Sequence, residues 1–359
     1  HTEKLVQHYN NRLIIDDTHN LLCEWNKKNW TLTSARKYFG IADGAFLYSK
    51  KQINIEIKSL HNIKTDCFVK NENIDSFIFL GDNVYGDIPS GNLNKMKKAY
   101  AKQKEMIPEW LLAKDVSVIW DDHDYGVNDG GASYPLKREA QQLYVNFWNI
   151  PSDDIRRVRP GIYTNKTVDI NGFKVNIILL DTRYFRSELD KSIGLRPVYK
   201  KNSSPDATIL GKEQWHWLED VIKQEADLAI IATSIQVLPT SHRFEKWSNF
   251  PNEHLKLKNL LKKSEVPILI ISGDRHQGAI YQENGIYEIT SSSLNKTISP
   301  SSFIGRPKEE DITMIGDMYS GENFGMITID TLSQHYEIEL KDLNGNRIKY
   351  KLIDINKGA

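Results

Sequence analysis

Cysteine is scarce in this chain of 359 residues, which has only Cys23 and Cys67 and no C-x-x-C spacing. Two cysteines are too few for a disulfide framework, and the lack of a closely spaced pair argues against a thiolate zinc site. Long apolar runs are also missing, because none approaches the roughly 18 residues that a membrane-spanning helix needs. We therefore expect a soluble, globular protein without a transmembrane segment.

Charge of one sign is not in excess either, since Lys plus Arg and Asp plus Glu both total 47. A neutral chain creates no global positive field, and the sequence carries no nucleic-acid-binding signature. Any preference for phosphate must therefore come from a local site. The given chain begins at His1 and contains no signal peptide, so we expect a processed mature form or a fragment.

The apolar pattern divides the chain into two parts. Residues 1–72 contain only short apolar stretches without a sustained period, and we expect strands and loops there that belong to the same domain as the rest. Residues 73–359 are expected to form the main α/β domain. It should end in a β-hairpin around Asn344-Gly345, a dipeptide typical of tight turns between strands.

Five apolar runs in the main domain predict buried strands, which end near residues 80, 119, 180, 233 and 271. Helical spacing predicts helices over residues 92–106, 136–148 and 212–225, whereas residues 187–209 and 236–251 are expected to be irregular. Polar side chains follow each strand at once, and ligands of α/β sheets bind outside the carboxyl ends of the strands. We therefore predict one rim that gathers Asp82, Asn83, Asp121, Asp122, His123, Asp124, Asp181, Arg183, Asp274 and His276.

The densest part of this rim is residues 120–131, where acids, a histidine and three glycines follow an apolar run. Carboxylates this close repel one another by a few kcal/mol at an effective dielectric constant of about 20. A bound cation would remove that repulsion, although a solvated acidic turn is the simpler alternative for this stretch taken alone. Carboxylates, an amide and a few histidines suit Ca²⁺, Mg²⁺, Mn²⁺, Fe³⁺ or Zn²⁺. Two such ions about 4 Å apart can hydrolyse a phosphoester, which is the reaction that fits best.

Six segments in this order resemble the signatures of the PhoD-like alkaline phosphatases, a branch of the calcineurin-like metallophosphoesterases. The resemblance covers about residues 74–295 and implies a hydrolase of phosphomonoesters or phosphodiesters. It also implies a four-layer αββα sandwich with the metal centre at the C-terminal ends of the strands. The segments are Gly81–Asp87, Trp120–Gly131, Leu180–Arg186, Ser234–Thr240, Phe244–Pro251 and Ser272–His276.

The resemblance assigns roles to individual residues. Asp82 corresponds to the bridging metal ligand, Tyr85 to an iron-binding tyrosinate, and Asp122 to a further ligand. His123 corresponds to the catalytic histidine, which acts together with Asp82 and a metal-bound hydroxide at a multi-metal centre. Asp274 and His276 match the closing ligand motif. Ca²⁺ and Fe³⁺ are the implied ions, with Mn²⁺, Zn²⁺ or Mg²⁺ as alternatives, and export to the periplasm or the medium is implied by analogy.

A second set of residues is expected to contact substrate or to orient the ligands. Asp121, Asp124 and Asn128 are expected to orient Asp122 and His123. Arg183 and Arg275 have the geometry to grip phosphate oxygens, or to pair with neighbouring acids instead. Asn83, Asp181 and His242 complete this set.

One feature of the family is missing from the sequence. Members open with a Ser-Cys-Asn-like motif about 30 residues before the Gly-Asp pair, whereas residues 46–53 contain no Cys here. The alternative to an enzyme is therefore an impaired phosphate-binding homologue that lost a metal ion with this motif. A third interpretation, a glycan- or surface-binding module that uses exposed tryptophans, requires no metal ion.

Overall fold

The computed structural model describes residues 14–16, 30–34, 45–48, 74–192, 198–294 and 309–355, the first three ranges by their backbone alone. The chain forms two compact units, one of residues 1–75 with 105–114 and one of residues 76–104 with 115–359. In the first unit the strands β1 (Ile14–Asp16), β2 (Trp30–Ser34) and β3 (Ala45–Tyr48) form a sheet, and α5 (Glu109–Leu112) is a short helix. The remaining residues of the predicted segment 1–72 lie outside the described residues.

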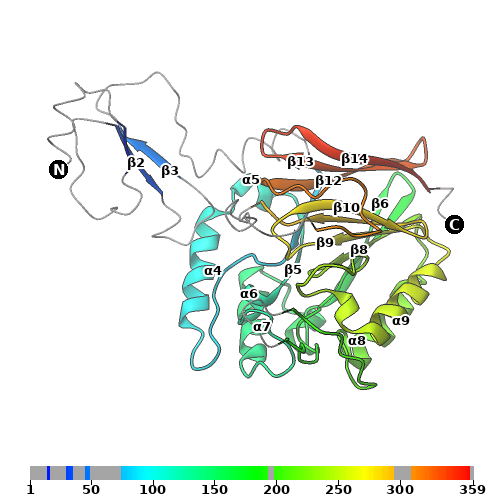
Figure 1. Cartoon of the computed structure of the whole chain (residues 1–359), viewed down its shortest axis with the longest axis horizontal. Coiled ribbons are helices and arrows are strands. Elements are labelled where there is room, and N and C mark those ends of the chain that lie inside the picture. Colours follow the sequence, from blue (N-terminus) through cyan, green and yellow to red (C-terminus); the bar gives the residue numbers. More distant parts are fainter. Residues whose placement is uncertain are drawn as a thin grey trace. The chain divides into compact units, whose positions relative to one another are not determined.

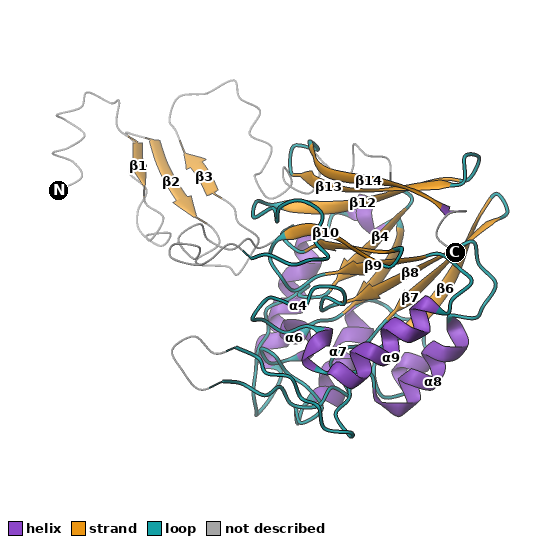
Figure 2. Ribbon diagram, turned by 45° about the vertical axis from the view of Figure 1, so that its right-hand side comes forward, coloured by secondary structure: helices purple, strands orange, loops and turns teal. Residues whose placement is uncertain are grey.

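A six-stranded sheet forms the centre of the second unit (Figures 1 and 2). Its inner strands β7, β8, β9 and β11 run parallel, and an antiparallel strand flanks them on each side. Because β8 and β9 are buried on both faces, their sequences are almost continuously apolar. In spatial order the strands are β10 (Gly278–Glu283), β11 (Ile286–Ser291), β9 (Ile268–Ser272), β8 (Leu228–Thr233), β7 (Phe173–Leu179) and β6 (Thr164–Ile170).

Two smaller sheets complete the strands of this unit. β4 (Ser76–Leu80) and β5 (Asp115–Ile119) pair in parallel. β12 (Asn323–Asp330), β13 (His335–Asp342) and β14 (Arg347–Asp354) form an antiparallel sheet. β13 and β14 are the hairpin that the Asn344-Gly345 dipeptide predicts.

The helices of the second unit are α4 (Asn94–Met106), α6 (Asp122–Tyr125), α7 (Lys137–Phe147), α8 (Gly211–Val221) and α9 (Pro251–Lys262), with short 3₁₀ turns η1 (Ile155–Arg157) and η2 (Trp247–Asn249). α8 ends four residues before the predicted boundary, because Lys223 and Gln224 bond to carbonyls three residues back and tighten the last turn. The predicted irregular stretch 236–251 ends one residue early, at residue 250. Pro251 opens α9, where a missing N–H costs nothing.

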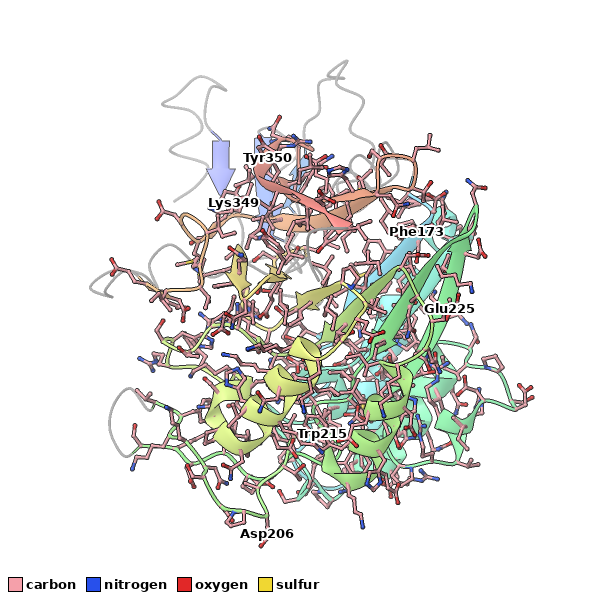
Figure 3. The ribbon with its side chains drawn as sticks, turned by 90° about the vertical axis from the view of Figure 1, so that its right-hand side faces the viewer. Phe173, Asp206, Trp215, Glu225, Lys349 and Tyr350 are labelled. Carbon is pink, nitrogen blue, oxygen red and sulfur yellow. The ribbon has the colours of Figure 1, made fainter. Side chains whose placement is uncertain are left out.

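Side chains on the two faces of the central sheet build two apolar cores. On one face Ile178, Ile231 and Ile270 pack with Trp215 of α8 and Leu257 of α9. Figure 3 shows Trp215 on this helical side and Tyr350 of β14 on the opposite side of the unit. Each fully buried aliphatic or aromatic side chain contributes about 1.5–3 kcal/mol.

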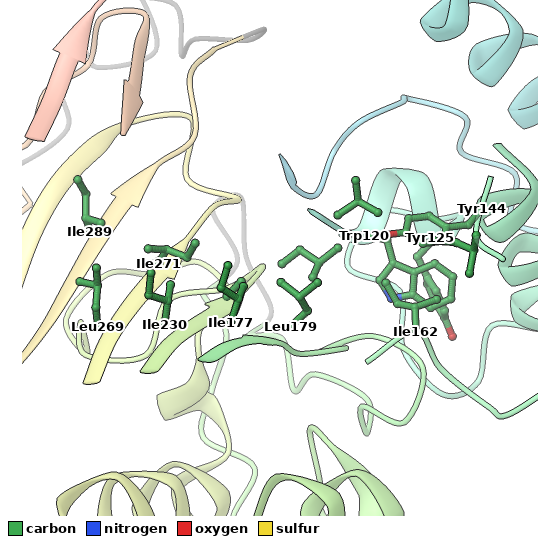
Figure 4. Close-up of a cluster of buried hydrophobic side chains, with 14 of the residues drawn as sticks. Trp120, Tyr125, Tyr144, Ile162, Ile177, Leu179, Ile230, Leu269, Ile271 and Ile289 are labelled. Carbon is green, nitrogen blue, oxygen red and sulfur yellow. The ribbon is translucent and has the colours of Figure 1, made fainter. Parts of the chain in front are cut away.

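The other face carries the larger core (Figure 4). Ile177 of β7 and Leu269 of β9 pack there with Ile338 of β13, and Tyr144 of α7 stacks edge-on against Trp120 at 5.3 Å. Trp120 directly precedes residues 121–124, which we call the acidic stretch, and its side chain is fully buried. The core therefore fixes the backbone from which the acidic stretch emerges.

Candidate metal centre

Strand ends deliver the predicted residues to the site. Asp82 follows β4, Asp122 follows the parallel neighbour β5, and Asp274 and His276 follow β9. Asp82, Asp274 and His276 all adopt left-handed backbone angles, with φ of 52°, 64° and 51°. Such conformations cost on the order of 1 kcal/mol or more for a non-glycine residue and cluster at functional sites.

Gly81 makes room for the turn that presents Asp82. Its φ is 101°, and a Cβ at this position would lie 2.4 Å from the Cβ of Asp121. Only glycine combines that backbone angle with such a close approach. The turn after β4 therefore packs directly against the acidic stretch after β5.

The first group of potential ligands consists of Asp82, Asp122 and His123, whose ligand atoms all lie within 4.8 Å of one another. Asp122 is 4% exposed, and its Oδ2 accepts a hydrogen bond from the backbone N–H of Asp129 at 2.7 Å. Its Oδ1 is buried and accepts no hydrogen bond within the described part of the chain. Burial and the charge of Asp82 raise the pKa of Asp122 to about 7. A cation would satisfy this oxygen and relieve the repulsion.

A second group of potential ligands also includes Asp82. The hydroxyl of Tyr85 donates to Oδ2 of Asp82 at 3.0 Å, and Nε2 of His276 lies 3.7 Å from the same oxygen. The Tyr85 hydroxyl is also 3.5 Å from Nε2 of His276. Burial and the nearby Asp82 raise the pKa of Tyr85, so the phenol keeps its proton unless a cation replaces it. Asp82 thus belongs to both groups.

His123 is held by a residue that the sequence analysis did not single out. Its Nδ1 lies 2.7 Å from Oδ1 of Asp87, its Nε2 lies 3.9 Å from Oδ1 of Asp122, and its ring stacks on Tyr85 at 4.3 Å. Burial lowers the pKa of His123, but the bond to Asp87 and the charges of Asp122 and Asp82 raise it to about 9. The only sequence signal for Asp87 is its place at the end of the Gly81–Asp87 segment.

A buried ionic network supports the acidic stretch. Arg183 donates from Nε to Asp121 at 2.6 Å and from its NH1 to Glu245 at 2.6 Å. Arg186 contacts the other oxygen of Glu245 at 2.8 Å, and the side chains of both arginines are fully buried. Of the two predicted alternatives for Arg183, the structure therefore displays pairing with acids. Glu245 was not predicted. Its only sign in the sequence is that it is the one acidic residue of the aromatic segment Phe244–Pro251.

The other predicted residues brace the loops. Asp124 accepts from the side chain of Asn83 at 2.5 Å, and Asp181 accepts from the indole of Trp120 at 2.8 Å. Asn128 donates to Asp129 at 2.6 Å and not to a residue of the two ligand groups. Burial and the charge of Asp122 raise the pKa of Asp274.

Arg275 and His242 form a contact of their own. The guanidinium of Arg275 donates to Nδ1 of His242 at 2.9 Å and pairs with Glu309 at 2.8 Å. It also lies 4.5 Å from the centre of the Phe244 ring. In this arrangement Arg275 pairs with an acid, as Arg183 does.

The comparison with protein families identifies the chain. Residues 113–340 match the model of the family described as PhoD-like phosphatase. The chain belongs to the PhoD-like phosphatase family. This membership confirms the resemblance predicted from the six sequence segments, and the structure confirms the mixed α/β class with several sheets.

Relatives of this PhoD-like chain differ from it in length. Alkaline phosphatase D of Bacillus subtilis (strain 168) is 24% identical over 204 residues, which span 49% of this chain and 33% of that protein. A structure titled "Structure of PhoD" superposes with a TM-score of 0.59 and 16% identity, covering 82% of this chain and 65% of the other. The matched residues thus span about a third of the length of that alkaline phosphatase.

A second solved structure matches this PhoD-like fold over most of its length. It is titled "GAP50 the anchor in the inner membrane complex of Plasmodium", and it superposes with a TM-score of 0.56 and 15% identity over 86% of each chain. At this identity the likeness concerns the fold alone. Among the described residues, no helix is long and apolar enough to cross a membrane.

Proposed function

We propose that this chain is a metal-dependent phosphoester hydrolase that acts on phosphomonoesters or phosphodiesters. The observation that carries the proposal is that Asp82 belongs to two groups of potential ligands. It forms one group with Asp122 and His123 and another with Tyr85 and His276. Membership in the PhoD-like family supports the same reaction class.

The residues present fit a centre of more than one metal ion, with Asp82 as the shared ligand. Asp122 has a buried oxygen without a hydrogen bond in the described structure, and Tyr85, His276 and Asp274 supply phenol, imidazole and carboxylate donors. This set suits a hard trivalent ion beside a divalent one, so we propose Fe³⁺ and Ca²⁺, with Mn²⁺, Zn²⁺ or Mg²⁺ as alternatives. Such ions activate water and offset the charge on phosphoryl oxygens.

His123 is proposed as the residue that moves a proton. Asp87 holds its Nδ1 at 2.7 Å, which leaves Nε2 to contact the phosphoryl group or to protonate the leaving oxygen. Because Asp87 pairs with the ring and so favours its protonated form, we assign His123 to catalysis rather than to the ligand set. Asp121, held by the buried Arg183, is proposed to orient the neighbouring ligand Asp122.

The test uses metal-stripped protein that is reloaded with Ca²⁺, Mn²⁺ or Fe³⁺ and assayed with p-nitrophenyl phosphate and bis-p-nitrophenyl phosphate. We expect turnover only after reloading. Asp82→Ala should lower both bound metal and activity at least 100-fold, whereas His123→Ala should lower activity and keep the metal. Asp206→Ala, which removes an exposed carboxylate elsewhere, is the matched control. Full activity of the first two variants would refute the proposal.

Three finer expectations accompany this function. Helices α8 and α9 on one face of the central sheet, with β12–β14 and residues of α4 and α7 packed on the side of the other face, support a four-layer αββα sandwich with the metal centre at the C-terminal strand ends. A metallophosphoesterase domain over residues 73–359, preceded by a segment 1–72, stays a prediction. So does export, which cell fractionation with an antibody would test.

A non-catalytic role is the second candidate. Residues 46–53 lack the cysteine of the family's first motif, and the chain matches the Plasmodium anchor protein over 86% of its length. An impaired homologue of this kind would bind phosphate or serve as an anchor without turnover. Elemental analysis of the purified protein separates the two, because fewer than one bound metal ion per chain together with no turnover would favour this candidate.

A further inference from the structure

His242 is a buried histidine that the proposed chemistry leaves unused. It lies in the loop after β8 and is 5% exposed. Its Nδ1 contacts Arg275, whereas its buried Nε2 has no hydrogen-bond partner within the described residues. Buried polar atoms without a partner are rare in native proteins, so this nitrogen requires an explanation.

Arg275 fixes which nitrogen of His242 carries the proton. A guanidinium can only donate, so Nδ1 of His242 must accept the hydrogen bond of 2.9 Å. Burial lowers the pKa of His242 well below its usual range, and the charges of Arg275 and Lys246 lower it further. The neutral ring therefore carries its proton on Nε2. In this tautomer Nε2 can donate to an acceptor and cannot bind a metal ion.

The position of His242 relates it to the proposed metal centre. Arg275, its partner, lies between the proposed ligands Asp274 and His276 in the sequence. The loop over residues 242–245 has two contacts of interest. His242 contacts Arg275 in the turn after β9, and Glu245, three residues later, binds Arg183, which also holds Asp121. Arg275 therefore links His242 to the turn that carries two of the proposed ligands.

The surroundings of the free N–H favour an anion. Arg275 lies against the ring, and the ammonium of Lys246 donates to the carbonyl of His242 at 2.5 Å and to that of Phe244 at 3.1 Å. Arg275 is already paired with Glu309, so the ammonium of Lys246 is the group whose positive charge favours a negatively charged acceptor at this buried donor.

We propose that His242 is a substrate-binding residue whose Nε2–H donates a hydrogen bond to an anionic oxygen of the phosphoester. Arg275 is the positioning residue that sets the tautomer. This inference rests on the proposed function and extends it, because it names a protein donor for substrate besides the metal ions. Inorganic phosphate offers the same oxygens and serves as the probe.

The experiment measures phosphate binding to the metal-loaded protein by calorimetry. His242→Phe keeps a ring but removes the donor, and we expect about tenfold to hundredfold weaker binding, the size of one hydrogen bond to a charged group. His242→Gln supplies an amide donor and should retain most of the affinity. The matched control is His254→Phe, because His254 is also buried but already donates to the carbonyl of Val237 at 2.8 Å. This control should keep the phosphate affinity.

A second measurement uses the wild-type protein, so its result does not depend on whether a variant folds. In protein with ¹⁵N-labelled histidine rings, the His242 signal should show the Nε2–H tautomer at neutral pH, and phosphate should shift it. Equal phosphate affinity of the wild-type and His242→Phe proteins, or an equal loss in His254→Phe, would overturn this inference and leave the proposed function standing. A wild-type protein that binds metal but neither phosphate nor substrate would overturn both.

Discussion

At the scale of single residues, the behaviour of His123 depends on Asp87. The two are 2.7 Å apart, and this hydrogen bond is the largest of the effects that raise the pKa of His123. An acid catalyst must carry its proton, so activity is lost as the pH rises through that pKa. The carboxylate of Asp87 therefore extends activity toward higher pH.

Replacing Asp87 with Asn tests this dependence. The amide keeps the shape but removes the charge, so we predict that kcat falls at least tenfold at neutral pH and that the alkaline limb of the kcat–pH profile moves to lower pH. Metal content, measured by elemental analysis, should stay that of the wild-type protein. An alkaline limb that does not move would mean that Asp87 has only a packing role.

The grouping of individual residues was predictable where their position directly after a strand decides it. Asp82, Asp122 and His123 each follow the end of an apolar strand, and parallel strands bring these ends together. The partners of Asp87 and Glu245 were not predictable, because they are 36 and 62 positions away in the sequence. Only the packing of the loops decides which charge such a residue meets.

At the scale of elements, the loops after β5, β7 and β8 are joined through buried charges. Asp121 follows β5, Arg183 follows β7, and Glu245 lies beyond β8, so one guanidinium connects three loops. The side chains of all three residues are at most 2% exposed. Removing one partner from such a group leaves the others charged and without compensation.

We predict that Arg183→Met lowers the free energy of unfolding by roughly 3–5 kcal/mol, the usual effect of breaking a buried ion pair. Urea unfolding followed by fluorescence measures it. Lys174→Ala is the control, because Lys174 pairs with Glu225 at 3.1 Å on the surface with its side chain 38% exposed, and no measurable change is expected. Similar results for the two variants would show that the buried network contributes little to stability.

The elements that the sequence predicted share a physical property. β4, β5 and β7–β9 are apolar over most of their length, whereas the edge strand β6 is polar and exposed on alternate residues and was not predicted. α9 was missed for another reason. Its first residue, Pro251, was taken as the end of an irregular stretch, although proline is equally common at the start of a helix.

At the scale of the whole molecule, the acidic rim makes stability depend on metal ions and on pH together. Burial and the charge of Asp82 raise the pKa of Asp122 to about 7 and that of Asp124 to about 8, and burial and neighbouring charges also raise the pKa values of Asp121 and Asp274. A carboxyl whose pKa is higher in the folded state binds more protons when folded. Its contribution to stability is therefore present at low pH and is lost as the pH rises from about 4 to 8.

We predict that metal-free protein loses thermal stability across this interval, by several degrees between pH 5 and pH 8. Bound cations compete with protons for the same oxygens, so metal-loaded protein should lose less, and the stabilisation by metal should grow with pH. Thermal unfolding of chelator-treated and reloaded protein at several pH values measures both slopes. Asp122→Asn removes one of the coupled carboxyls and should flatten the metal-free slope, whereas Asp206→Ala should leave it unchanged. Parallel curves with and without metal would show that these carboxylates do not share a bound ion.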